Sequence, residues 1–269
     1  MGETMIKLIA TDLDGTLINN NRTIPDDFEE IWNILNDNGI VFLAATGRDY
    51  HGAAGFFGDF ANKMMFICDN GANIYDKGKV IETHNIPKEK VHRMLREIDK
   101  IDNADPMLCG TKGTYVTEGS PAFMAKMANH YSPLTWVDNL YEIDDDIFKV
   151  SVYDATGDIK NHTYLPLAEK FGSENTIHMS ANIWVDMMDN SADKGLAIQS
   201  LQKMFGASFE ETMAFGDFYN DEPLLKNAKY AFVVENAPDD LKEKYPYHTA
   251  SNNDSGVTKA IRQCVLEKL

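Results

Sequence analysis

The chain has 269 residues, and 43% of them are hydrophobic, so it is long enough to bury one large core or two smaller ones. It carries 42 acidic and 25 basic residues, a net charge of −17, which argues against binding to nucleic acid or to an anionic membrane surface. The three cysteines lack metal-type spacing, no apolar run reaches the length of a membrane span, and the N-terminus lacks a secretory signal pattern. We expect a cytoplasmic protein and a monomer.

The first predicted element is a buried strand that ends in two carboxylates. The apolar run at residues 5–10 is followed by Asp12, Leu13, Asp14 and a Gly-Thr pair. Ligands bind at the carboxyl ends of strands in open α/β sheets. Two carboxylates about 4 Å apart repel each other by roughly 4 kcal/mol at an effective dielectric near 20. An isolated Asp-x-Asp-Gly is also ordinary turn chemistry, but this pair favours a bound cation or a chemical task.

A helix and a second buried strand follow. The helix is predicted by apolar residues at helical spacing, namely Phe28, Ile31, Trp32 and Leu35. Strand 41–45 then ends in Thr46, Gly47 and Arg48, and a Thr hydroxyl and a Gly N–H are good donors to a phosphate oxygen. A Thr-Gly turn is common on its own. The glycines of segment 49–60 do not fit the dinucleotide fingerprint, and we expect a mobile helix or loop there.

From about residue 83 the pattern changes to strands and helices mixed at high density. In chain order, the pattern predicts a helix from about residue 91, strand-like runs at 105–117 and 147–153, helices around 121–131 and 158–171, and a strand pair at 176–188. This density is typical of an α+β module, and we expect it to be inserted into the first domain.

The chain then returns to alternating helices and strands. Ser191 or Asp193 is a suitable N-cap for a helix that begins near Lys194. The helix macrodipole disfavours a cation at this end by a few tenths of a kcal/mol, so Lys194 is understandable if it faces an anion. A solvated surface lysine is the alternative. A strand at 213–216 then ends in Asp217, and Asn220 and Asp221 follow one turn later. In the alternative, these acids merely cap the next helix.

Four such segments, each at a strand end or a helix start and in this order, resemble the motifs of the haloacid dehalogenase (HAD) superfamily of phosphohydrolases. Residues 12–16 match its first motif, 46–48 the second, Lys194 with Gly195 the third, and 216–221 the fourth. The stretch between the second and third motifs resembles the cap insertion of the Cof-type (IIB) branch. The resemblance covers the whole chain. It implies an α/β fold: a Rossmann-like, doubly wound parallel-sheet core from residues 1–82 and 190–269, with an α+β cap at 83–189 that selects the substrate.

The resemblance also implies an activity. The family's chemistry would make the chain a Mg²⁺-dependent phosphatase that hydrolyses small phosphorylated metabolites, either sugar phosphates or phosphorylated cofactors, through an aspartyl-phosphate. Asp12 would attack phosphorus, and Asp14 would protonate the leaving alkoxide and later deprotonate the hydrolytic water.

The family's ligands map onto this chain residue by residue. The metal would be held by the Asp12 carboxylate, the Asp14 backbone carbonyl and the Asp217 carboxylate, an oxygen-only set that suits Mg²⁺. Asp221 would orient Lys194 or a metal-bound water. The groups that would hold the phosphoryl oxygens are the Leu13 backbone N–H, Thr46, Gly47, Lys194 and Asn220.

Two other functions stay open. One is a phosphotransferase of the phosphomannomutase type, which shares the four motifs, although the insertion lacks an arginine-rich surface for a second phosphate. The other is a non-catalytic sensor of phosphorylated metabolites. Such sensors usually lose a nucleophile or metal ligand, whereas Asp12, Asp14, Lys194 and Asp217 are all present. Arg48 has two open roles, in the substrate cleft or in a structural ion pair.

Overall fold

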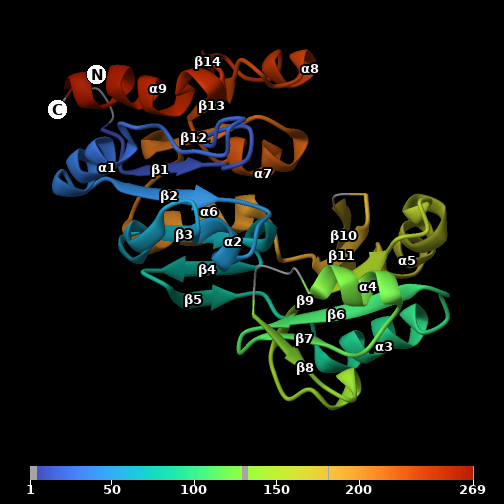
Figure 1. Ribbon diagram of the computed structural model, residues 1–269. Helices are drawn as coiled ribbons and strands as arrows, with labels where there is room; N and C mark the ends of the chain where they lie inside the picture. Colours follow the sequence, from blue (N-terminus) through green and yellow to red (C-terminus); the bar gives the residue numbers. More distant parts are fainter. Residues whose placement is uncertain (1–4, 129–132, 181, 269) are drawn as a thin grey trace. The chain divides into compact units, whose positions relative to one another are not determined.

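The computed structural model describes residues 5–128, 133–180 and 182–268, which form two compact units (Figure 1). The first unit comprises Met1–Glu82 and Asp193–Leu269, and the second comprises Thr83–Ala192. Each unit has its own sheet, and the apolar clusters of the first unit share no residue with that of the second. Within the described ranges, no helix is both long and apolar enough to cross a membrane.

The first unit is built on a mainly parallel sheet. Its strands lie in the order β14 (Tyr247–Thr249), β13 (Tyr230–Val234), β12 (Thr212–Gly216), β1 (Leu8–Thr11), β2 (Val41–Ala45), β3 (Met65–Cys68), β4 (Asn73–Asp76) and β5 (Lys79–Thr83). The strands from β14 to β3 pair in parallel, and β4 pairs antiparallel to β3. The carboxyl ends of β1, β2 and β12 therefore meet at one edge of the sheet.

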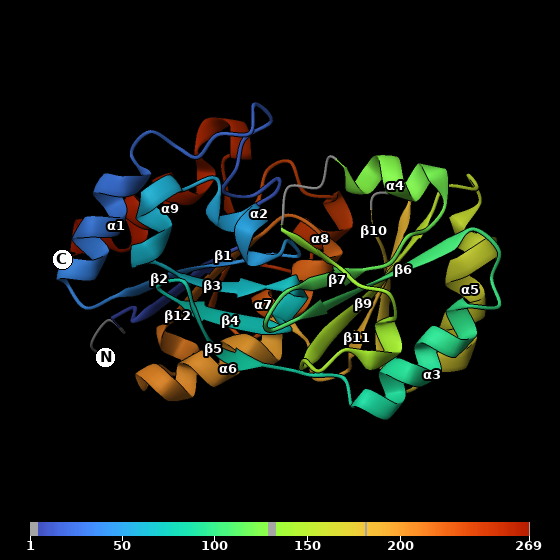
Figure 2. The same ribbon diagram turned by 60° about the horizontal axis from the view of Figure 1, so that its bottom comes forward.

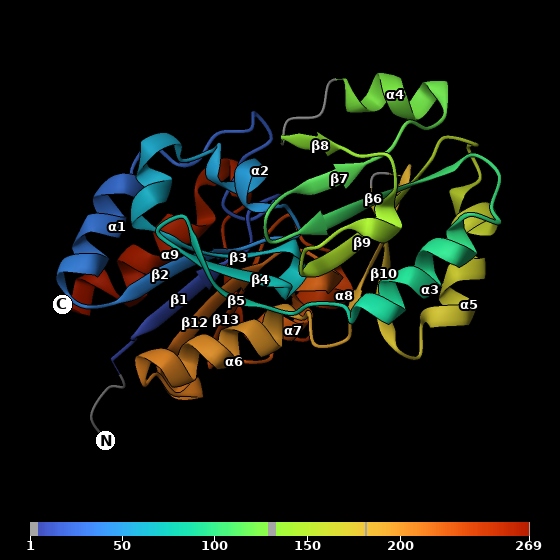
Figure 3. The ribbon, with the colours of Figure 1, turned by 90° about the horizontal axis from the view of Figure 1, so that it is seen from below.

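Helices cover both faces of this sheet (Figure 3). One face packs against α1 (Phe28–Asp37), α2 (Tyr50–Ala54) and α9 (Gly256–Cys264), and the other against α6 (Lys194–Phe205), α7 (Glu222–Leu225) and α8 (Asp239–Lys242). Because side chains alternate along a strand, Ile9 of β1 belongs to the first apolar cluster, whereas Leu8 and Ala10 belong to the second. The predicted fold class, a doubly wound parallel-sheet core with an α+β insertion, is confirmed.

The second unit is an α+β module (Figure 2). Its strands lie in the order β10 (Asn175–Ser180), β11 (Trp184–Asp189), β9 (Ile147–Asp154), β6 (Ala104–Gly110), β7 (Thr114–Val116) and β8 (Leu134–Trp136). All described pairs are antiparallel except β7 with β8. Helices α3 (Lys88–Ile98) and α5 (Leu165–Phe171) contribute the helical part of its core, and α4 (Pro121–Met127) begins at the capping side chain of Ser120.

The element predictions differ from the structure mainly in short segments. Strands β5, β8 and β14 are not predicted, because they are short and their pairing depends on neighbouring strands. The helix expected at 121–131 ends at Met127, and residues 129–132 lie outside the described ranges. The segment 49–60 forms α2 and then enters a 3₁₀ helix at Gly58–Lys63, and the ring of Phe57 packs on Phe28.

Candidate active site

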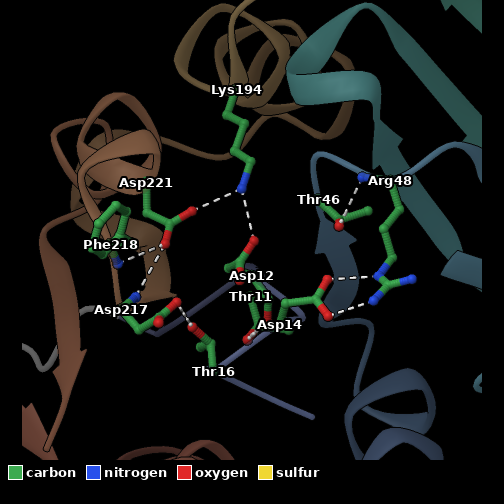
Figure 4. A network of polar contacts seen from close by, with 10 residues as sticks. All are labelled: Thr11, Asp12, Asp14, Thr16, Thr46, Arg48, Lys194, Asp217, Phe218 and Asp221. Carbon is green, nitrogen blue, oxygen red and sulfur yellow. Dashed lines mark hydrogen bonds and ion pairs between the residues drawn. The ribbon is translucent and has the colours of Figure 1, made fainter. Parts of the chain in front are cut away.

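The predicted site residues of three motifs lie just beyond three neighbouring strands (Figure 4). Asp12 follows β1, Thr46 follows β2 and Asp217 follows β12. Thr11 of β1 is in register with Ala44 of β2 and with Phe215 of β12, so the following residues emerge at the same edge of the sheet. Segments about 200 residues apart in the chain are brought together in this way, as the parallel-sheet fold requires.

Lys194 is buried between two of the predicted acids. The side chain of Asp193 caps α6 by accepting hydrogen bonds from the backbone N–H groups of Gly195 and Leu196, at 2.8 and 3.0 Å, which fixes the first turn of the helix. Lys194 Nζ then lies 2.7 Å from Asp12 Oδ1 and 2.7 Å from Asp221 Oδ1, with 1% of its side chain exposed. The alternative of a solvated surface lysine is therefore wrong.

Asp221 holds the turn after β12 in shape. Its side chain is fully buried, and while Oδ1 accepts from Lys194, Oδ2 accepts from the backbone N–H groups of Asp217 and Phe218, at 3.0 and 3.2 Å. These bonds fix the direction in which the Asp217 side chain leaves the backbone. Thr16, which is not among the predicted site residues, donates its hydroxyl to Asp217 Oδ1 at 3.0 Å.

Asp12, Asp217 and Asp221 each place one carboxylate oxygen within 4.8 Å of the other two. Burial and the neighbouring charge of Asp221 raise the pKa of Asp12 well above its usual range and raise the pKa of Asp217 to about 6. Burial alone would lower the pKa of Lys194, but Asp12 and Asp221 raise it above its ordinary value. One ammonium group thus faces three carboxylates. An all-oxygen donor set with excess negative charge fits a hard divalent cation such as Mg²⁺.

Asp14 lies outside this acidic group. Its carboxylate faces Arg48, whose Nε and a terminal nitrogen lie 2.6 Å from its two oxygens, and about half of the Asp14 side chain is exposed. The guanidinium also stacks over the ring of Phe56, 5.0 Å from its centroid. Of the two roles left open for Arg48, the structure shows the ion pair, and its partner is a predicted catalytic residue. No local pattern in the sequence indicates this partner.

The other predicted phosphate ligands differ in how firmly they are held. Thr46 is buried, and its hydroxyl oxygen accepts a hydrogen bond from the Arg48 N–H at 3.1 Å. Leu13 is buried in the first apolar cluster. Asn220 is exposed in a short 3₁₀ helix, Tyr219–Asp221, and within the described residues its side chain makes no hydrogen bond to Asp12, Thr46 or Lys194. Asn220 is thus the predicted ligand that the fold constrains least.

The sequence and the fold of the chain are similar to those of known proteins. Residues 9–261 match the sequence model of a family described as haloacid dehalogenase-like hydrolase. The 5-amino-6-(5-phospho-D-ribitylamino)uracil phosphatase YbjI of Escherichia coli is 27% identical over 95% of each chain, and the HMP-PP phosphatase of Yersinia enterocolitica is 26% identical over 90% of this chain and 88% of its own. A crystal structure from Streptococcus mutans, 28% identical, superposes with a TM-score of 0.80 over 96% of this chain and 98% of its own.

Proposed function

The chain belongs to the haloacid dehalogenase-like hydrolase family and is an enzyme of its phosphatase type, and from this premise we propose that it is a Mg²⁺-dependent phosphatase of small phosphorylated metabolites. The class of substrate is taken from the relatives, which are named for a phosphorylated ribityl compound and for HMP-PP. The observation that carries the proposal is the buried contact of Lys194 with Asp12 and Asp221, next to Asp217.

Asp12 is the proposed nucleophile. One of its oxygens forms a bond to phosphorus while the bond from phosphorus to the leaving alkoxide breaks, which leaves an aspartyl-phosphate. Lys194 fixes the orientation of the carboxylate through its 2.7 Å contact with Oδ1 and places a positive charge near the incoming phosphoryl oxygens. Asp221, the other partner of Lys194, holds the ammonium group in this place.

The proposed metal ligands are the carboxylates of Asp12 and Asp217 and the backbone carbonyl of Asp14. When bound there, Mg²⁺ would offset the negative charge of the phosphate and of the carboxylates, so that an anionic nucleophile can approach an anionic substrate. Thr16 holds Asp217 in place by its hydrogen bond to Oδ1. Thr46, Gly47, Lys194, Asn220 and the Leu13 backbone N–H are the proposed ligands of the phosphoryl oxygens.

Asp14 is the proposed acid and base. It would give a proton to the alkoxide as the first bond breaks, and would take a proton from the water that later attacks the aspartyl-phosphate. In the structure both carboxylate oxygens of Asp14 are held by Arg48, each at 2.6 Å. We therefore propose that Asp14 leaves Arg48 when it acts as an acid, which its partial exposure permits.

The two alternatives receive less support. A phosphotransferase would require a grip on a second phosphate. The sequence of the second unit has two arginines, Arg93 and Arg96, and Arg93 is already paired with Glu174 at 3.4 Å. A sensor without activity would have no need of a buried nucleophile, lysine and acid in contact, because a buried ion pair costs desolvation energy. We also propose that the protein works as a cytoplasmic monomer.

The test is a panel of sugar phosphates, phosphorylated cofactors and nucleotides, assayed with the purified protein and Mg²⁺. We expect release of inorganic phosphate from at least one class, with a kcat/KM of about 10⁴ M⁻¹s⁻¹ or more for the best substrate. Conversion of one sugar phosphate to another without phosphate release would identify the phosphotransferase instead. Saturable binding without any turnover would identify the sensor.

We propose that the second unit selects the substrate. All proposed site residues belong to the first unit, whose two apolar clusters contain no residue of Thr83–Ala192. Replacing residues 83–189 by a short Gly/Ser linker should therefore spare part of the p-nitrophenyl phosphate activity, while preferences within the panel flatten because binding energy from the rest of the substrate is lost. Circular dichroism checks folding. A folded variant with the same substrate ranking would place selectivity in the first unit.

A further inference from the structure

The turn Asp69–Gly71, which follows β3, has an unusual backbone. Asp69, Asn70 and Gly71 adopt φ values of 49°, 53° and 103°. Three consecutive residues with positive φ are rare, and two of these three carry a side chain that disfavours this conformation. Such strain persists only where surrounding contacts hold it, and it often occurs at functional sites. The contacts that hold this turn lead to two segments of the proposed phosphate site.

The first contact is with the loop Thr46–Arg48. The Asn70 N–H donates to the Thr46 carbonyl at 3.0 Å, and the Asp69 N–H donates to the Arg48 carbonyl at 2.9 Å. In a trans peptide the N–H points opposite to the C=O. Because the Thr46 carbonyl is turned toward Asn70, the N–H of Gly47 points away from it. The turn therefore sets the direction of one of the proposed phosphate donors.

The second contact is between side chain and backbone. A Cβ atom on Gly47 would lie 3.0 Å from Asn70 Oδ1 and 3.3 Å from Nδ2, so the amide packs directly on Gly47. Oδ1 is buried and accepts no hydrogen bond from the described residues. Leaving a buried acceptor unpaired is costly, so the amide is not placed here for its own hydrogen bonding. The amide instead packs on Gly47, and this contact limits where the backbone of Gly47 can lie.

The same turn also touches the segment that presents Lys194. A Cβ atom on Gly71 would lie only 2.3 Å from the carbonyl carbon of Asp193, the residue that caps α6. Only glycine permits this approach. One turn thus packs against the loop of the second motif and against the helix start of the third.

We propose that Asn70 is a positioning residue of the phosphate site. Through its backbone N–H and its side-chain amide, Asn70 fixes the position of the Gly47 N–H relative to Lys194. The proposal rests on the function proposed above. It predicts that removing the amide alone, with the turn left intact, weakens phosphate binding and turnover together, since a displaced donor serves both the bound and the reacting phosphoryl group.

Asn70→Gly tests this, because glycine adopts the left-handed conformation freely and only the side chain is lost. The matched control is Asn103→Gly, an exposed asparagine of the second unit that also has a positive φ, of 58°. We expect Asn70→Gly to lower kcat/KM for p-nitrophenyl phosphate by about 10- to 100-fold and to raise the inhibition constant of inorganic phosphate by about tenfold. The melting temperature should fall little in either variant, and Asn103→Gly should keep the wild-type kinetic constants.

A double-mutant cycle with Gly47→Ala gives a second, independent measurement. When Asn70 is present, the methyl group introduced by Gly47→Ala meets its amide, so this substitution should impair phosphate binding. In the Asn70→Gly background the space is empty. The losses caused by the two substitutions should therefore not add. Additive losses, or wild-type phosphate inhibition in Asn70→Gly, would overturn the role of Asn70 while leaving the proposed function intact. A wild-type protein that neither binds inorganic phosphate nor hydrolyses the substrate would overturn both.

Discussion

Asp12→Asn is expected to lower turnover by at least about 10⁴-fold, because the amide cannot form the bond to phosphorus. The substitution keeps the shape of the side chain, so folding should be preserved. The measurement is steady-state hydrolysis of p-nitrophenyl phosphate, together with acid quenching of the protein after exposure to radiolabelled substrate. The wild type should retain label on the protein, and Asp12→Asn should retain none. Label that persists in this variant would place the nucleophile elsewhere.

Asp14→Asn is the matched comparison. Asp14 lies only two residues after Asp12 in the chain, but it pairs with Arg48, whereas Asp12 pairs with Lys194. The Asp14→Asn variant should still form the aspartyl-phosphate, but it should do so slowly when the leaving group needs a proton. We expect kcat/KM to fall by about 10²- to 10⁴-fold for alkyl phosphates and by much less for p-nitrophenyl phosphate. Equal losses with both leaving groups would count against Asp14 as the acid.

Removal of the metal is expected to abolish activity. The Asp217→Asn substitution is expected to abolish the stabilisation of the fold by Mg²⁺. Without a cation, the carboxylates of Asp12, Asp217 and Asp221 repel one another across less than 4.8 Å. Adding Mg²⁺ at 100 times its dissociation constant should raise the free energy of unfolding of the wild type by about 2.7 kcal/mol. Denaturant unfolding with and without Mg²⁺ measures this. Asp14→Asn, which keeps the backbone carbonyl, should respond like the wild type.

In metal-free buffer, the free energy of unfolding should depend differently on pH in the wild type and in Asp217→Asn. The pKa of Asp217 is about 6 in the folded protein, above its ordinary value near 4, because of burial and the charge of Asp221. The unfolded chain therefore loses this proton first, and the contribution of Asp217 to stability declines as the pH rises from about 4 to about 6. Asp217→Asn lacks this decline, so its stability relative to the wild type should increase by roughly 1–2 kcal/mol over that interval. A constant difference would show that Asp217 titrates normally.

The sequence predicts those features that depend on local pattern. Apolar runs that end in Asp12, Thr46 and Asp217 locate three strand ends, and the rule that ligands bind at the carboxyl edge of an open α/β sheet brings them together. Lys194 could be placed at a helix start because Asp193 is a good N-cap, and its burial between acids follows only once the fold is known. The order of four motifs then identifies the family.

Features that depend on packing between distant segments could not be predicted. The pairing of Asp14 with Arg48 joins residues 34 positions apart, and neither residue type indicates the other as its partner. The turn at Asp69–Gly71 carries an Asn-Gly signal, which predicts a turn, but nothing local indicates that the turn braces the loop at Thr46. Such contacts depend on how β3 is placed beside β2, which is a property of the whole sheet.

The separate cores of the two units have a consequence for how this chain can diverge. In polymer terms, Thr83–Ala192 is a closed loop whose ends leave and re-enter the first unit. The entropy of closing a loop grows only logarithmically with its length, by about 0.6 kcal/mol for each doubling. The first unit therefore gains or loses little stability when the inserted segment is lengthened, shortened or exchanged. A lineage can replace this segment while the residues at the strand ends of the first unit stay unchanged.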